Sequence, residues 1–138
     1  MKGKGSIFEK VNHIGIVVKN LHEALESYSR GFGLEAERIV EISDVGLRIA
    51  VLKIGGIEIE LLEYQNLELP VVKALRADRP GINHVCYEVS DFKKAVENLK
   101  TNGFQLVEGF PRKGVHGMIA FFIPPHSPEE RLEILEVE

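Results

Sequence analysis

The alternation of hydrophobic and polar residues changes its period along the chain, and the change occurs twice. Within residues 11–18, apolar side chains take every second position from Ile14 through Ile16 to Val18, which is typical of a half-buried strand. Apolar residues then recur every three or four positions, which predicts a helix packed on that strand. The apolar face of the predicted helix consists of Leu21, Ala24, Leu25, Tyr28 and Phe32.

Signals at the ends of this helix, and the segments after it, complete a first module. Asn20 followed by Glu23 predicts a capped helix start, and Gly31 and Gly33 predict its end. The pair Gly55-Gly56 predicts a tight turn between two strands. The strands predicted in this half cover residues 35–41, 46–54 and 57–64. The second half is predicted to contain a linking helix over 69–77, strand 82–89, helix 91–101, and strands near 104–108, 117–123 and 131–137.

The two halves are also similar in sequence. Residues 11–18 match residues 82–89 at an offset of 71 (84 − 13), and residues 59–63 match 132–136 at an offset of 73 (133 − 60). Two copies without a short period indicate a duplicated module. We predict the α+β class, as one domain over 1–138 with two βαβββ modules in tandem, at about 10–65 and 81–138, joined by a linker helix at about 68–79. Their mostly antiparallel strands are expected to form a curved sheet around an open cavity.

Each module places one histidine in its first strand and one glutamate in its last strand. Because Ile14 and its alternate neighbours face the helix, His13 points the other way, and the same pattern holds for His84. Glu60 alternates with apolar residues, and the repeat assigns Glu133 the matching position. Taken singly, each is most often a core histidine or a solvated glutamate. Two carboxylates buried together need a cation to compensate their charge, so the joint pattern favours a divalent metal such as Co, Ni, Mn, Fe or Zn.

Other polar side chains are weaker candidates. His22 in the first turn of a helix and His126 in a proline-rich loop are expected to be solvated. Glu58 and Glu88 share faces with the proposed ligands and are second-rank cavity candidates. Cys86 either faces the cavity or is a small buried cysteine without reactivity.

Charge and composition narrow the class of protein. Lys and Arg total 17 against 21 Asp and Glu, a net charge of −4, so the concentrated basic face of a nucleic-acid-binding protein is not expected. The single cysteine fits a reducing compartment. Residues 1–10 are short and polar, which is unlike a signal peptide, and no apolar run is long enough to span a membrane. We therefore expect a cytoplasmic protein.

Several segments resemble one family. Residues 11–21, VNHIGIVVKNL, resemble an opening IDHIGIAVKDL, and residues 60–63, ELLE, resemble a later ELLEP. These two comparison motifs are found in the vicinal oxygen chelate superfamily (glyoxalase, bleomycin resistance and dioxygenase proteins), and within it in the methylmalonyl-CoA epimerases. The chain therefore resembles this family. The resemblance covers about residues 10–138. It implies that His13, Glu60, His84 and Glu133 hold one divalent ion, cobalt before the others. The family's last ligand aligns with Glu133 only after a one-residue deletion, which leaves Glu136 as an alternative.

The resemblance also implies a reaction. A metal-dependent isomerase of this kind would invert C2 of a methylmalonyl-CoA-type thioester through a metal-stabilised enolate, with Glu133 as ligand and base. Arg112 and Lys113 would bind coenzyme A phosphates, or else form an ordinary polar turn. The family implies a homodimer. Some epimerases carry a second base on the strand matching 46–54, where this chain has no acid. Two alternatives therefore stay open: a glyoxalase I-like lyase or isomerase on another small oxo-compound, and a non-catalytic protein that binds a small ligand.

Overall fold

The computed structural model describes residues 6–138 and has a mixed α+β fold, which confirms the predicted class. Residues 1–5, part of the start for which no signal peptide is predicted, lie outside the described part. The chain divides into two compact units. We call residues 13–84 the N-terminal unit, and residues 85–138 with the described residues up to Asn12 the C-terminal unit. The strand predicted to open the first module therefore contributes to both units.

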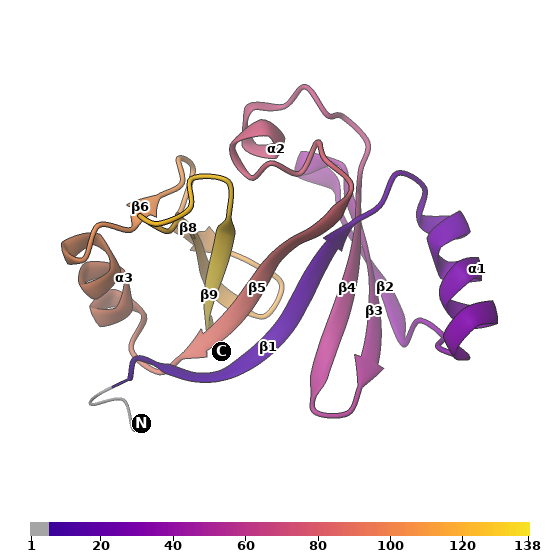
Figure 1. Ribbon diagram of the computed structural model, residues 1–138, viewed down its shortest axis with the longest axis horizontal. Coiled ribbons are helices and arrows are strands. Elements are labelled where there is room, and N and C mark those ends of the chain that lie inside the picture. The colour runs from indigo at the N-terminus through magenta and orange to yellow at the C-terminus, as the bar shows by residue number, and fades with distance from the viewer. Residues whose placement is uncertain (1–5) are drawn as a thin grey trace. The chain divides into compact units, whose positions relative to one another are not determined.

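The N-terminal unit contains the elements predicted for the first module (Figure 1). Its strands are ordered β2-β3-β4-β1, with β1 parallel to β4 and the other two pairings antiparallel. The turn between β3 and β4 falls on Gly55-Gly56, as predicted. The elements are β1 (Phe8–Val17), α1 (Leu21–Phe32), β2 (Arg38–Ile42), a short 3-10 helix (Ser43–Val45), β3 (Leu47–Ile54), β4 (Ile57–Tyr64), α2 (Pro70–Ala74) and the start of β5 (Gly81–Val89).

The C-terminal unit repeats this arrangement. Its strands are ordered β5-β9-β8-β6, and β7 pairs with β8 beside that series. The pairings of β8 with β6, β7 and β9 are all antiparallel. The elements after β5 are α3 (Phe92–Thr101), β6 (Gln105–Leu106), β7 (Arg112–Lys113), β8 (Gly117–Ile123) and β9 (Arg131–Val137).

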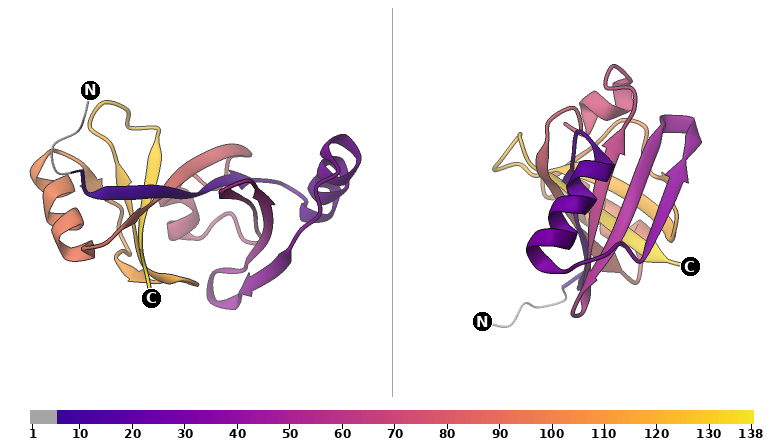
Figure 2. Two further views of the ribbon diagram at one scale, coloured as in Figure 1. Left: turned by 90° about the horizontal axis from the view of Figure 1, so that it is seen from below. Right: turned by 90° about the vertical axis from the view of Figure 1, so that its right-hand side faces the viewer.

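The predicted alternation in the first strand is confirmed by the packing of α1. Ile14, Ile16 and Val18 pack against a buried cluster that includes Leu21 of α1 and Leu61 of β4. Figure 2 shows α1 lying across one face of the strands of this unit. Burial of such side chains contributes roughly 1.5–3 kcal/mol each, which holds the helix on this face. The opposite face of β1 and β4 is thereby left for His13 and Glu60.

Five sequence predictions differ from the structure. The linker helix predicted over 69–77 is shorter, α2 at Pro70–Ala74, because Arg76 has a left-handed φ of 55° that an α-helix does not continue through. Phe32 is 72% exposed, although it was predicted on the buried face, because it is the last residue of α1, where the ring of Tyr28 meets its ring edge to face. Gly31 lies inside α1, and Gly33 alone ends it with a left-handed φ of 68°. The strand predicted at 35–41 is β2, Arg38–Ile42. The strand predicted near 104–108 has only two residues, and β7 was not predicted, because pairs this short depend on β8.

Both main helices are capped in the same two ways. The side chain of Asn20 accepts a hydrogen bond from the Glu23 amide at 2.9 Å, and Asp91 accepts one from Lys94 at 3.1 Å. A glutamate from the last strand of each module accepts another amide hydrogen bond at the start of the helix. Glu63 accepts from Leu21 at 3.0 Å, and Glu136 accepts from Phe92 at 2.9 Å. The last strand of each module therefore holds the helix of that module by a carboxylate.

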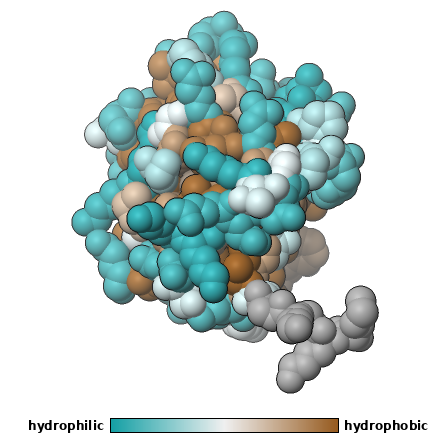
Figure 3. Space-filling view, turned by 90° about the vertical axis from the view of Figure 1, so that its left-hand side faces the viewer, coloured by the Kyte–Doolittle hydropathy of each residue, from teal (hydrophilic) through white to brown (hydrophobic). Residues whose placement is uncertain are grey.

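The surface on the side of α3 is mostly hydrophilic, with small hydrophobic areas between the polar side chains (Figure 3). The charged residues of α3 include Lys93, Lys94, Glu97 and Lys100, and all four are exposed. Among the described residues, no helix is both long and apolar enough to cross a membrane.

Replacing Glu136 by alanine is expected to lower the free energy of unfolding by about 0.5–2 kcal/mol, because the amide of Phe92 loses its side-chain acceptor. Urea denaturation followed by circular dichroism measures the change. Glu108→Ala, at an exposed position of the same unit, is the control. An unchanged midpoint for Glu136→Ala would show that the carboxylate contributes nothing to the helix.

Candidate metal centre

His13 and Glu60 meet on the face of the N-terminal unit opposite α1. The parallel pairing of β1 with β4 sets Gly15 opposite Glu60 and His13 opposite Glu58. His13 is 5% exposed and Glu60 is 7% exposed. The Nε2 atom of His13 lies 3.3 Å from Oε1 of Glu60. A carboxylate this deeply buried is costly unless a hydrogen bond or a positive charge compensates it.

His84 completes a cluster of three donor groups. Its Nε2 lies 3.3 Å from Nε2 of His13, and the two rings meet edge to face with 5.4 Å between their centroids. The Nδ1 atom of His84 lies 2.8 Å from Oδ1 of Asn83. The ring lies directly over Gly15, where a Cβ would overlap it at 2.7 Å from Nε2. Glycine at this position is therefore required for the observed place of the His84 ring.

The chemistry of the three groups suits a divalent ion. Two imidazole nitrogens and a carboxylate oxygen are ligands that cobalt, nickel, manganese, iron and zinc share. Bonds of about 2.1 Å that meet at an angle of about 105° put two ligand atoms roughly 3.3 Å apart, and both observed separations equal that value. A cation would also neutralise the buried carboxylate. The arrangement in the N-terminal unit is consistent with three of the four predicted ligands.

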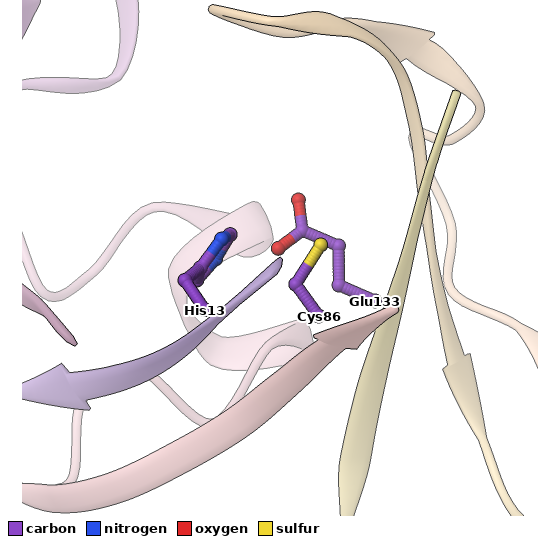
Figure 4. Close-up of side chains that lie close together, drawn as sticks. All are labelled: His13, Cys86 and Glu133. Atoms are coloured by element: carbon purple, nitrogen blue, oxygen red, sulfur yellow. The ribbon is translucent and has the colours of Figure 1, made fainter. Parts of the chain in front are cut away.

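Glu133 lies in the C-terminal unit. It lies on β9, paired with Phe121 of β8, and is 6% exposed. The next residue of the strand, Ile134, belongs to the hydrophobic core of this unit. Figure 4 shows the carboxylate of Glu133 and the thiol of Cys86 pointing toward one another from β9 and β5. The Sγ atom of Cys86 lies within 4.8 Å of a carboxylate oxygen of Glu133. Cys86 is fully buried, as expected for a small buried cysteine, the second of its two predicted environments.

The alternative ligand Glu136 has a different environment. Its Oε2 accepts the hydrogen bond from Phe92 at the start of α3, on the helix side of β9. Its repeat partner Glu63 makes the same contact with α1. Because strand residues three apart lie on opposite faces, Glu133 and Glu136 cannot both face the helix. This favours Glu133 as the residue equivalent to Glu60.

The second-rank acids have local partners. Glu58 lies 3.8 Å from Arg38, and Glu88 accepts a hydrogen bond from Asn12 at 2.8 Å and lies 3.6 Å from Lys10. The solvated positions predicted for two histidines are confirmed. The exposed histidines are His22, paired with Glu26 at 3.1 Å, and His126, paired with Glu130 at 3.3 Å.

Arg112 and Lys113 form the short strand β7. The guanidinium of Arg112 lies 4.9 Å from the centre of the Phe110 ring and donates to the carbonyl of Gly109 at 3.1 Å. Lys113 is 70% exposed and lies 3.1 Å from Glu138. Arg112 thus stabilises its own turn, whereas the charge of Lys113 is accessible from solvent.

Comparison with known proteins assigns the family. The model of the Glyoxalase/Bleomycin resistance protein/Dioxygenase superfamily matches residues 12–122. The chain belongs to this superfamily. Its similarity within the superfamily is to methylmalonyl-CoA epimerases. The mitochondrial methylmalonyl-CoA epimerase of Dictyostelium discoideum is 30% identical over 128 residues, which cover 92% of this chain and 77% of that protein.

Solved structures of the superfamily agree. The methylmalonyl-CoA epimerase of Mycobacterium tuberculosis superposes with a TM-score of 0.80 at 26% identity, covering 99% of this chain and 93% of that one. A variant of the Streptomyces coelicolor epimerase, in complex with 2-nitronate-propionyl-CoA, superposes with a TM-score of 0.78 at 26% identity, covering 94% of this chain and 95% of that one. The resemblance identified from the sequence motifs is therefore confirmed.

Sequence reasoning missed two residues of the site. Gly15 leaves the space that the ring of His84 occupies, and Asn83 contacts the other nitrogen of that ring. The repeat contained a signal for the second, since Asn12 precedes His13 as Asn83 precedes His84. No sequence signal identified Gly15, because the need for glycine arises from a residue distant in sequence.

Gly15→Ala is expected to weaken cobalt binding at least tenfold, since the new methyl group displaces the ring of His84 from its place beside His13. Isothermal titration of the metal-free protein measures the dissociation constant. Gly31→Ala is the matched control, because a Cβ there meets nothing within 4 Å. Equal affinity in both variants would contradict the assignment of His84 as a ligand.

Proposed function

We propose that this chain is a divalent-metal-dependent epimerase that inverts C2 of a methylmalonyl-CoA-type thioester. The observation that carries the proposal is the buried cluster in which Nε2 of His13 lies 3.3 Å from donor atoms of both His84 and Glu60, in a chain similar to methylmalonyl-CoA epimerases. The analogue bound to the Streptomyces coelicolor relative is an acyl-CoA, which supports the substrate class.

In this proposal Glu133 joins His13, Glu60 and His84 as the fourth ligand. Its burial and its equivalence to Glu60 in the repeat support this role. Cobalt is expected first, with nickel, manganese, zinc and iron as alternatives. When bound, a divalent ion supplies a Lewis acid that lowers the energy of negative charge on the carbonyl oxygens of a substrate.

Glu133 is also the proposed general base. Its carboxylate accepts the proton from C2, and the electron pair of the C2–H bond moves into the thioester to give an enolate. Return of a proton to the opposite face of C2 gives the other epimer, so no atoms are gained or lost. A buried carboxylate suits this task, because exclusion of water strengthens its interactions in the transition state.

The source of the returning proton decides between two functions. Strand β3, Leu47–Ile54, contains no Asp or Glu, so a second acid at that strand is not available. One carboxylate that reaches both faces of C2 would suffice for epimerisation. The same absence favours, as the second candidate, a glyoxalase I-like lyase or isomerase that moves a proton between two carbons of one small oxo-compound.

The deciding measurement is proton–deuterium exchange at C2 of methylmalonyl-CoA in heavy water, with protein stripped of metal and reloaded with cobalt. We expect exchange with inversion that depends on the metal. Glu133→Gln is expected to reduce the rate at least about 100-fold, the usual effect of losing a general base.

Glu108→Gln, an exposed glutamate on the same unit, is the control and should retain the full rate. A full rate in Glu133→Gln would contradict the role of Glu133 as base. Stoichiometric metal binding without exchange would contradict the epimerase and favour the glyoxalase-like reaction.

Lys113→Gln is expected to raise KM for methylmalonyl-CoA about fivefold with kcat unchanged, because an exposed cation that pairs with a coenzyme A phosphate contributes about 1 kcal/mol. The corresponding pantetheine thioester, which lacks the nucleotide phosphates, should show no change. Glu138→Gln breaks the same ion pair but keeps the lysine, and is the control. An equal KM for Lys113→Gln and wild type would contradict the contact between Lys113 and a coenzyme A phosphate, and would support a purely structural role for β7.

The homodimer and the cytoplasmic location expected from the sequence stay predictions.

A further inference from the structure

Asn83 lies between the end of α2 and the ring of His84. Its Nδ2 donates to the backbone carbonyl of Leu75 at 3.0 Å and lies 3.4 Å from that of Arg76. Its Oδ1 lies 2.8 Å from Nδ1 of His84. All four residues belong to the N-terminal unit.

These contacts determine which way the amide faces. Carbonyl oxygens only accept hydrogen bonds, so the NH2 group of Asn83 must face Leu75 and Arg76. The amide oxygen is then directed at His84. An amide oxygen also only accepts, so Nδ1 of His84 must carry a hydrogen to make the 2.8 Å contact.

The protonation of Nδ1 has a consequence for the other nitrogen. In a neutral imidazole one nitrogen carries the hydrogen and the other carries the lone pair. With the hydrogen on Nδ1, the lone pair of His84 is on Nε2, the atom that lies 3.3 Å from Nε2 of His13. A nitrogen can bind a metal only through such a lone pair.

We propose that Asn83 is a positioning residue, which fixes His84 as the Nδ1–H tautomer and so presents its Nε2 lone pair to the cluster with His13 and Glu60. The assignment of the tautomer does not depend on the proposed function. Only the binding of a metal ion by Nε2 rests on that function. Metal-binding histidines commonly have such a partner on the second nitrogen, and its loss costs about 10- to 100-fold in affinity.

The end of α2 is built as a firm support for this amide. Arg76 has a left-handed φ of 55°, although it is not glycine, and its amide donates to the carbonyl of Lys73 at 3.0 Å. The next amide, of Ala77, donates to Val72 at 2.8 Å. These bonds hold the turn in which two successive carbonyls, of Leu75 and Arg76, face the same side chain. Asn83 thereby links the linker helix to the proposed ligand.

Two variants separate positioning of the ring from simple anchoring of α2. Asn83→Leu removes both the acceptor for His84 and the donors to α2. Asn83→Asp keeps an acceptor and loses the donors. Nitrogen-15 NMR of the imidazole rings in metal-free protein, with His84 assigned by loss of its signals in His84→Gln, reads the tautomer directly. Titration with cobalt then gives the affinity.

We expect the Nδ1–H tautomer in the wild type and in Asn83→Asp, and a shift toward the Nε2–H tautomer in Asn83→Leu. Cobalt affinity should fall about 10- to 100-fold in Asn83→Leu and by less in Asn83→Asp. Asn98→Leu, at an exposed position on α3, should change neither quantity.

Three results would overturn the inference: a wild-type His84 with its hydrogen on Nε2, an unchanged tautomer in Asn83→Leu, or a tautomer lost equally in both variants. The first needs no variant to fold. A wild-type tautomer that depends on Asn83, in a protein that does not exchange C2 of methylmalonyl-CoA, would leave this inference standing and overturn the proposed epimerase.

Discussion

The structure of the N-terminal unit depends on burying two imidazoles and a carboxylate, with Nε2 of His13 3.3 Å from both Nε2 of His84 and Oε1 of Glu60. Burying such groups costs free energy because they lose their hydration. Neighbouring groups in the fold must therefore form hydrogen bonds with them or neutralise their charge. Parallel pairing of β1 with β4 sets His13 and Glu60 on one face, and Gly15 leaves room for His84. The apolar residues that alternate with them pack on α1. The helix α1 and the polar cluster thus lie on opposite faces of the same pair of strands, β1 and β4.

The last strand of each module acts on both of its faces. Glu60 faces the donor cluster, and Glu63, three residues later, holds the start of α1. Glu133 and Glu136 have the same spacing, and Glu136 holds the start of α3. Because residues three apart in a strand lie on opposite faces, a slip of one residue would exchange the two roles. Helix capping therefore also specifies the register that places the buried carboxylates.

The duplication is not symmetric in its chemistry. Cys86 takes the position that corresponds to Gly15, and its thiol lies beside Glu133, whereas Gly15 lies under the ring of His84. Asn12 and Asn83 correspond in the same way. The amide of Asn12 donates to Glu88, and that of Asn83 donates to the end of α2. The two halves share a framework but surround their histidines differently.

The sequence by itself determined the class of fold, the order of its main elements and the equivalence of His13 with His84 and of Glu60 with Glu133. These depend on period and repetition, which are local properties of a chain. Tertiary structure alone decided that Phe32 is exposed, that Glu136 caps a helix, that position 15 requires glycine and that Asn83 contacts the ring of His84. Each of these is set by a neighbour in space, from a carbonyl at the end of α2 to an amide 44 residues away in the chain. Periodicity assigns a side chain to a face, and only the packed neighbours decide what that side chain contacts there.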